Sequence, residues 1–238
     1  MNSKVFSSVG IKGLEINADK AEVHFIQRRG TKDITVSFEG EFISKPCEVK
    51  NDTLFINAKC RSFILLKGAI PPKINIFIPE EFLGNYTLIS ASAVYSEMNK
   101  IKSFQFVNGN IKFKKFSFRT ISCESFKINA DIENLDVSIS EVGTCEIQPY
   151  SVVNLDDTMI VRFECESFMS VNISAYSTWL SSIDFYSISP KVENSTNSLG
   201  YIAEKNSTVH GTTPNSIAKL YAKSHVSNIF VADISQKE

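Results

Sequence analysis

Histidines are the side chains best suited to acid–base and metal chemistry near neutral pH, and this chain has three of them. His24 lies in a stretch of alternating apolar and polar residues, whereas His210 and His225 lie in or beside polar segments. The sequence has no GxSxG, HExxH, Walker or GxGxxG motif, which removes the usual basis for assigning a hydrolase, zincin, P-loop or dinucleotide-binding protein. We therefore expect surface histidines, no catalytic residues, no metal and no cofactor.

Cysteines are the second group that could do chemistry. Their number is odd and they show no CxxC or Cys/His zinc spacing, which is typical of free thiols in a reducing compartment. Three of them lie at similar intervals, and we expect Cys123, Cys145 and Cys165 to fill one inward column as small apolar side chains. The full set is Cys47, Cys60, Cys123, Cys145 and Cys165.

A group of carboxylates is spaced so that its members can share one face of a fold made of stacked strands. It consists of Asp131, Glu133, Asp136 and Glu141. Solenoid enzymes that act on polysaccharides place acidic groups along such a face for acid–base or metal-assisted work. A solvated outer face is the more common arrangement, so we favour it and keep a carbohydrate-binding or carbohydrate-acting module as an alternative function.

A basic cluster interleaves with phenylalanines between residues 112 and 127, as in a nucleic-acid platform. Alternation directs the phenylalanines inward and leaves a charged outer face, which keeps a strand surface soluble and blocks sideways strand addition. With 25 Lys+Arg against 26 Asp+Glu, the formal net charge of -1 also provides no basic field. We predict no nucleic-acid partner. The basic residues are Lys112, Lys114, Lys115, Arg119 and Lys127.

The single tryptophan stands among other aromatic residues where the regular alternation breaks down. The group consists of Tyr176, Trp179, Phe185 and Tyr186. One interpretation makes it an exposed patch for a sugar ring or a partner protein. The other, which we favour, is a plug that packs over the end of the fold. The patch is nevertheless the only binding surface that the sequence suggests.

Apolar and polar residues alternate with a period of two through most of the chain, and this spacing predicts strands. No stretch of about twelve residues keeps a helical apolar stripe with caps, and even 216–223 fits alternation, so we predict a strand there. From residue 100 onward the clearest apolar–polar–apolar triplets are 104–106, 116–118, 126–128, 135–137, 145–147, 153–155, 161–163 and 171–173.

The spacing of these triplets predicts how the strands are arranged. Successive triplets lie roughly ten residues apart, which is too short for a self-standing unit, so each must stack on its neighbours. The motif Cys-Glu-Ser-Phe at 123–126 returns at 165–168, two coils later if one coil takes about 21 residues. We therefore predict an all-β, single-domain β-helix-like solenoid with about 20–22 residues per coil, in which strands pair in parallel.

The ends of such a tube expose unpaired backbone and need a cap. Residues 1–80 have longer and less even strands, and we predict that they form an N-terminal cap. Regular coils are expected over 81–192, a polar surface loop over 193–216 and closing strands over 217–235.

Several segments together match a known pattern. They are GIKGLEI at 10–16, AEVHF at 21–25, TLFI at 53–56, INIFIP at 74–79, the run of coils, and a closing segment at 218–231. In these segments, which span nearly the whole chain, the sequence resembles the bacterial putative-adhesin family of unknown function. The family's usual Ser-Gly-Asp corner is replaced here by forms such as Asn108-Gly109-Asn110. The resemblance implies a right-handed β-helix-like domain and carries over no catalytic residue.

The 238 residues suffice for a core without disulfide or metal staples, and no charge-free apolar run approaches the ~20 residues of a membrane span. Residues 1–10 lack the apolar stretch of about 7–15 residues that a secretory signal needs, so we expect a cytoplasmic protein without membrane insertion, with organelle targeting or a non-classical surface location as the alternatives. The favoured function is a non-enzymatic scaffold or binding protein whose partner is a protein or a glycan. A self-assembling structural element is a further alternative.

Overall fold

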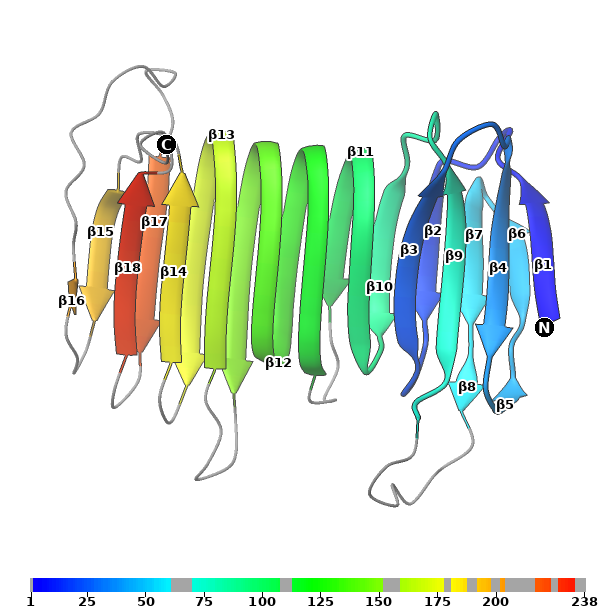
Figure 1. Cartoon of the computed structure of the whole chain (residues 1–238), viewed down its shortest axis with the longest axis horizontal. Coiled ribbons are helices and arrows are strands. Elements are labelled where there is room, and N and C mark those ends of the chain that lie inside the picture. The colour runs from blue at the N-terminus through cyan, green and yellow to red at the C-terminus, as the bar shows by residue number, and fades with distance from the viewer. Residues whose placement is uncertain are drawn as a thin grey trace.

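The chain folds into strands that stand side by side along the long axis of the molecule (Figure 1). The computed structural model describes residues 2–60, 70–107, 113–151, 159–177, 181–187, 192–197, 202–203, 217–223 and 227–233. Within these ranges every regular element is a β-strand, so the predicted all-β class is confirmed. The same ranges contain no helix long and apolar enough to cross a bilayer.

The strands have these bounds: β1 Asn2–Ser7, β2 Gly13–Asn17, β3 Glu22–Arg28, β4 Asp33–Glu39, β5 Phe42–Ser44, β6 Cys47–Lys50, β7 Thr53–Asn57, β8 Lys59–Cys60, β9 Lys73–Pro79, β10 Asn85–Ser90, β11 Ala93–Val107, β12 Phe113–Ser151, β13 Met159–Ser177, β14 Ser181–Ser187, β15 Val192–Asn197, β16 Ile202–Ala203, β17 Ile217–Lys223 and β18 Ser227–Asp233. The strand predicted over 216–223 is confirmed as β17.

Two rows of hydrogen-bonded strands run along the molecule. The first row has the order β1-β4-β9-β3-β11-β12-β13-β14-β18-β16. The second row runs from β6 through β7, β2, β10, β11, β12, β13 and β17 to β15. The long strand β11 belongs to both rows, because residues 93–97 pair with β3 while residues 103–106 pair with β10.

Pairing is parallel through most of both rows and antiparallel at the N-terminal end. There β1 and β9 flank β4 in antiparallel register, and β6 lies antiparallel to β7. Parallel pairing begins early in the chain, since β2 pairs with β10 and β3 with β11. Both β2 and β3 lie within the segment predicted to cap the fold.

The C-terminal rows include part of the segment predicted as a polar loop. β15 pairs with β17 and β16 pairs with β18, so residues 193–197 and 202–203 of that region are strands. Main-chain groups carry this pairing, and polar side chains do not prevent it when a neighbouring strand offers unpaired donors and acceptors. The remaining residues of the predicted loop lie outside the described ranges.

Side chains from the two rows meet in one apolar core. In the triplets 104–106, 116–118, 126–128, 135–137, 145–147 and 161–163 the first and third residues are buried, as the alternation predicts, and the middle residue is more exposed. Phe104 of the second row contacts Phe116 and Phe118 of the first row, with ring centroids 5.7 and 4.7 Å apart. Burying such large side chains supplies about 2–3 kcal/mol each, which makes this core the main source of stability.

The register between neighbouring strands is uneven. The number of residues from Phe104 to its pairing partner Phe126 equals the number from Val161 to its pairing partner Ile183. The advance from Val137 to its partner Phe163 is longer. Because these intervals are unequal, residues that recur at a similar spacing in the sequence need not lie opposite one another on neighbouring strands.

The predicted single column of thiols is therefore wrong. Cys123, Cys145 and Cys165 are all buried, as predicted. However, Cys123 pairs with Ile101, and Cys165 pairs with Ile139, while the register partner of Cys145 is Val171. Cys145 and Cys165 thus occupy different register positions, because the interval between β12 and β13 is longer than the repeat read from the sequence.

Candidate binding groove

The aromatic residues predicted as a binding patch are divided between the two rows. Tyr176 belongs to the part of β13 that pairs with β17, opposite Lys223, in the second row. Phe185 and Tyr186 lie in β14 of the first row, opposite Val231 and Ala232 of β18. Trp179 lies outside the described residues. A binding patch made of these four residues stays a prediction.

Of the three histidines, only His24 lies within the described residues. His24 lies in β3, with its Nε2 atom 3.3 Å from Oε2 of Glu22. Its ring stacks on that of Tyr95, with centroids 4.7 Å apart and an interplanar angle of 24°. His210 and His225 lie outside the described residues. Within the described part of the chain, no group of three or more His, Cys, Asp or Glu side chains is arranged to hold a metal ion.

Two basic residues singled out in the sequence form ion pairs with carboxylates on the outer faces. Arg119 donates from Nη2 to Oδ2 of Asp136 at 3.0 Å. Lys127 lies 2.7 Å from Glu146. Since Phe116 and Phe118 are buried while Lys115, Arg119 and Lys127 are exposed, the predicted charged outer face is confirmed for these residues.

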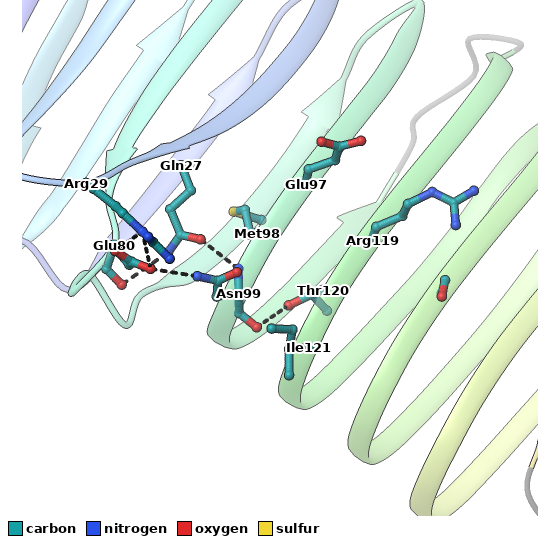
Figure 2. A pocket seen from close by; sticks show the side chains of 10 residues that line it. Gln27, Arg29, Glu80, Glu97, Met98, Asn99, Arg119, Thr120 and Ile121 are labelled. Carbon is teal, nitrogen blue, oxygen red and sulfur yellow. Dashed lines mark hydrogen bonds and ion pairs between the residues drawn. The ribbon is translucent and has the colours of Figure 1, made fainter.

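A hollow of about 490 Å³ opens on the first row where the ends of β3 and β9 meet β11 and β12 (Figure 2). Because β3 and β9 are parallel and pair Arg28 with Pro79, the residues that follow both strands emerge together. This arrangement places Arg29 beside Glu80. Arg29 Nε lies 3.1 Å from Glu80 Oε2 and 3.3 Å from Oε1.

Hydrogen bonds join the floor of this hollow across four strands. The amide of Gln27 donates from Nε2 to the Glu80 carbonyl at 3.1 Å, and its Oε1 accepts from the Asn99 backbone N–H at 2.7 Å. Asn99 Nδ2 donates to Glu80 Oε1 at 2.9 Å. The Thr120 hydroxyl donates to the Asn99 carbonyl at 3.1 Å. The hollow is therefore preformed, because each of these side chains is held by its neighbour.

A second hollow of about 370 Å³ lies next to the first on the same row. His24, Tyr95 and Ser117 contribute to it from β3, β11 and β12. Gln27, Glu97 and Arg119 line both hollows and so join them. We call the two hollows together the groove.

Charges in the groove are largely balanced. Arg29 is paired with Glu80, and Arg119 with Asp136. Among the described residues, no ion pair or hydrogen bond holds the exposed carboxylate of Glu97. Partial burial, followed by the nearby charge of Glu22, raises the pKa of the Tyr95 hydroxyl, so this residue stays neutral under ordinary conditions.

Of the groove residues, only His24 and Arg119 stood out in the sequence. Gln27, Glu80 and Asn99 lie on segments separated by up to about seventy residues, and only the register of β3 with β9 and β11 brings them together. Polar residues at strand ends are common in sequences of this kind. No sequence signal marked these three as neighbours.

Comparison with known proteins gives distant structural similarities. No protein-family model and no curated protein matches this sequence. A "putative cell adhesion protein" from Clostridium sporogenes ATCC 15579 has 12% sequence identity and a TM-score of 0.37, with 97% of each chain covered. A "putative adhesin" from Bacteroides fragilis NCTC 9343 has 13% identity and a TM-score of 0.42, covering 97% of this chain and 96% of its own. Similarities this weak carry no argument about this chain, and the family resemblance stays a prediction.

Proposed function

We propose that this protein is a non-enzymatic binding protein whose groove on β3, β11 and β12 holds a partner on a rigid β-helix-like scaffold. The observation that carries the proposal is the set of hydrogen bonds from Gln27, Asn99 and Thr120, which fixes the groove before any partner arrives. A preformed site loses little conformational entropy on binding.

The scaffold part of the proposal is a right-handed solenoid with about 20–22 residues per coil. Its support is the parallel register, in which the chain advances equally from Phe104 to Phe126 and from Val161 to Ile183. The passage of β11 from one row to the other also supports it. Right-handed winding is the general preference of parallel crossovers.

The non-enzymatic part is supported by the state of the carboxylates in the groove. Hydrolysis of glycosidic bonds normally needs two carboxyl groups facing the same bond. Glu80 is engaged by Arg29 and Asn99, and Asp136 is engaged by Arg119, which leaves Glu97 as the one described carboxylate of the groove without a partner. This arrangement favours binding over turnover. A cytoplasmic location remains part of the proposal, supported by five cysteines in the free state.

The test is an affinity pulldown from an extract of the native source. It compares what is retained by the unmodified chain with what is retained by two charge-reversed variants. Glu97→Lys changes the groove, whereas Glu124→Lys changes an exposed residue of β12 that does not line it. Retained proteins and glycans are identified by mass spectrometry. We expect at least one component to be retained by the unmodified chain and by Glu124→Lys but lost by Glu97→Lys. Retention of nothing, or of the same set by all three, would overturn the proposal.

A further inference from the structure

The two faces of the Tyr95 ring have different neighbours. Tyr95 pairs with His24 of β3 on one side and with Ser117 of β12 on the other. The stacked His24 ring covers the β3 side at a centroid distance of 4.7 Å. On the β12 side the register partner is Ser117, and the ammonium of Lys115, also on β12, lies 5.9 Å from the ring centroid, so this side borders the 370 Å³ hollow and carries one flexible side chain.

We infer that this groove binds a neutral sugar chain, with one pyranose ring stacked on the β12-facing side of Tyr95. The inference deepens the proposed function and rests on it. Aromatic rings attract the weakly positive C–H groups of a flat apolar surface, and a pyranose ring presents such a surface. The ammonium of Lys115 lies 5.9 Å from the Tyr95 centroid, within the range of a cation–π contact, so a sugar ring stacked on this face has to displace this flexible, exposed side chain.

Hydroxyl groups of a sugar would find both acceptors and donors beside the ring. Glu97 and Arg119 are register partners on β11 and β12, and both line the groove (Figure 2). The carboxylate of Glu97 accepts hydrogen bonds and is held by no other described residue. The Ser117 hydroxyl can donate or accept, and the guanidinium of Arg119 donates. Charge-assisted hydrogen bonds of this kind orient a ligand more strongly than neutral ones.

The charges around the groove offset one another and give no net attraction for an anionic ligand. The two arginines of the groove are paired with Glu80 and Asp136, and the exposed ammonium of Lys115 is offset in charge by the exposed carboxylate of Glu97. Adding an anion would also place it near the exposed carboxylate of Glu97. A ligand without charge meets no such penalty, because only its hydroxyl groups exchange water for protein partners.

The length of the groove indicates more than one sugar ring. From Tyr95 to Asn99 the strand advances four residues, or about 13 Å at the usual rise of an extended chain. The shared residues Gln27, Glu97 and Arg119 connect the Tyr95 hollow with the one around Asn99. An oligosaccharide lying along β11 would therefore stack at Tyr95 and hydrogen-bond onward toward Asn99.

Isothermal titration calorimetry of the full chain tests the inference with a fixed set of probes. The neutral probes are cellohexaose, xylohexaose, mannohexaose and chitohexaose, and the acidic probes are hexagalacturonate and heparin. We expect at least one neutral probe to bind more tightly than either acidic one. Its association constant should fall about 5- to 10-fold in Tyr95→Ala and persist in Tyr95→Phe, which keeps the ring. Phe55→Ala, which truncates a half-buried aromatic residue of β7 outside the groove, is the matched control and should leave binding unchanged.

Glu97→Gln provides a second variant, because it changes an exposed carboxylate and puts the fold at little risk. It should weaken binding of the same neutral probe. Failure of all neutral probes to bind, preference for an acidic probe, or full binding by Tyr95→Ala would overturn the inference. If no sugar binds but the extract yields a protein whose retention depends on Glu97, the sugar inference falls and the proposed binding function stands.

Discussion

Phe104 and Phe126 occupy paired positions on successive strands of the second row and stack with ring centroids 5.6 Å apart and planes inclined by 21°. Both side chains are almost completely buried, at 1% exposure each. Phe118 closes the stack from the first row, with its centroid 5.0 Å from that of Phe126. The same rings therefore hold neighbouring strands in register and join the two rows.

Phe126 and Lys127 are adjacent residues whose substitution should have opposite consequences. Phe126→Asp would bury an unpaired charge, so we expect a loss of several kcal/mol and an unfolded chain. Lys127 is about half exposed, and Lys127→Asp replaces its 2.7 Å ion pair with a repulsion from Glu146. That change should cost about 1 kcal/mol or less. Urea unfolding followed by circular dichroism measures both, and equal losses would contradict the assignment of inward and outward faces.

Alternation made the burial of individual residues predictable. In the triplets 116–118 and 135–137 the flanking apolar residues are buried, because successive side chains of a strand point to opposite faces. The same argument placed Lys127 outward, but it did not reveal Glu146 as its partner. The partner depends on which residues of the next turn of chain lie opposite, and this is a matter of register.

The sequence alone did not predict the register between neighbouring strands. The Cys-Glu-Ser-Phe repeat suggested coils of equal length. However, more residues separate paired positions of β12 and β13 than separate paired positions of β11 and β12, so the repeat does not fix the register. The groove escaped prediction for the same reason. Gln27 and Asn99 become hydrogen-bonding neighbours only when β3 pairs in parallel with β11, and nothing in the local sequence marks that pairing.

Gly143 is a position where any side chain would collide with the backbone. A Cβ atom placed there would lie 2.4 Å from the carbonyl oxygen of Glu124 on the adjacent part of β12. Gly143→Ala should therefore destabilise the fold by about 1–3 kcal/mol, since a backbone atom cannot move aside as a flexible side chain can. The exposed neighbour Thr144 provides the control, because Thr144→Ala removes only a 3.3 Å hydrogen bond to Ser125. Thermal unfolding that ranks Thr144→Ala as the more damaging change would refute this account.

Tyr86 buries a hydroxyl that has no hydrogen-bond partner among the described residues. Its ring is well packed, since it meets Phe25 and Phe82 edge to face at 5.7 and 6.2 Å. Tyr86→Phe keeps these contacts and removes the unpartnered hydroxyl, so the free energy of unfolding should rise by about 1 kcal/mol. Denaturant titration of the two proteins decides the matter, and a fall of similar size would show that the hydroxyl is bound after all.

Buried thiols should make the fold weaker in alkaline solution. Burial raises the pKa of Cys123 from 9.0 to about 12, and burial, reinforced by charges at Cys165 and other neighbours, raises that of Cys145 well above 9.0. Between the unfolded and folded pKa values the unfolded chain releases thiol protons that the folded chain keeps. The stabilisation is therefore complete below about pH 9 and declines as the pH rises toward 12.

The size of this effect can be measured as the difference in unfolding free energy between pH 8 and pH 10. Each strongly shifted thiol should contribute about 1 kcal/mol to the loss. Cys123→Ala should reduce the loss by that amount whatever its effect at pH 8. Cys47→Ala should reduce it less, because Cys47 is only partly buried and the charge of Lys4 opposes the upward shift of its pKa. An identical pH dependence in the unmodified chain and Cys123→Ala would mean that Cys123 does not titrate from a buried site.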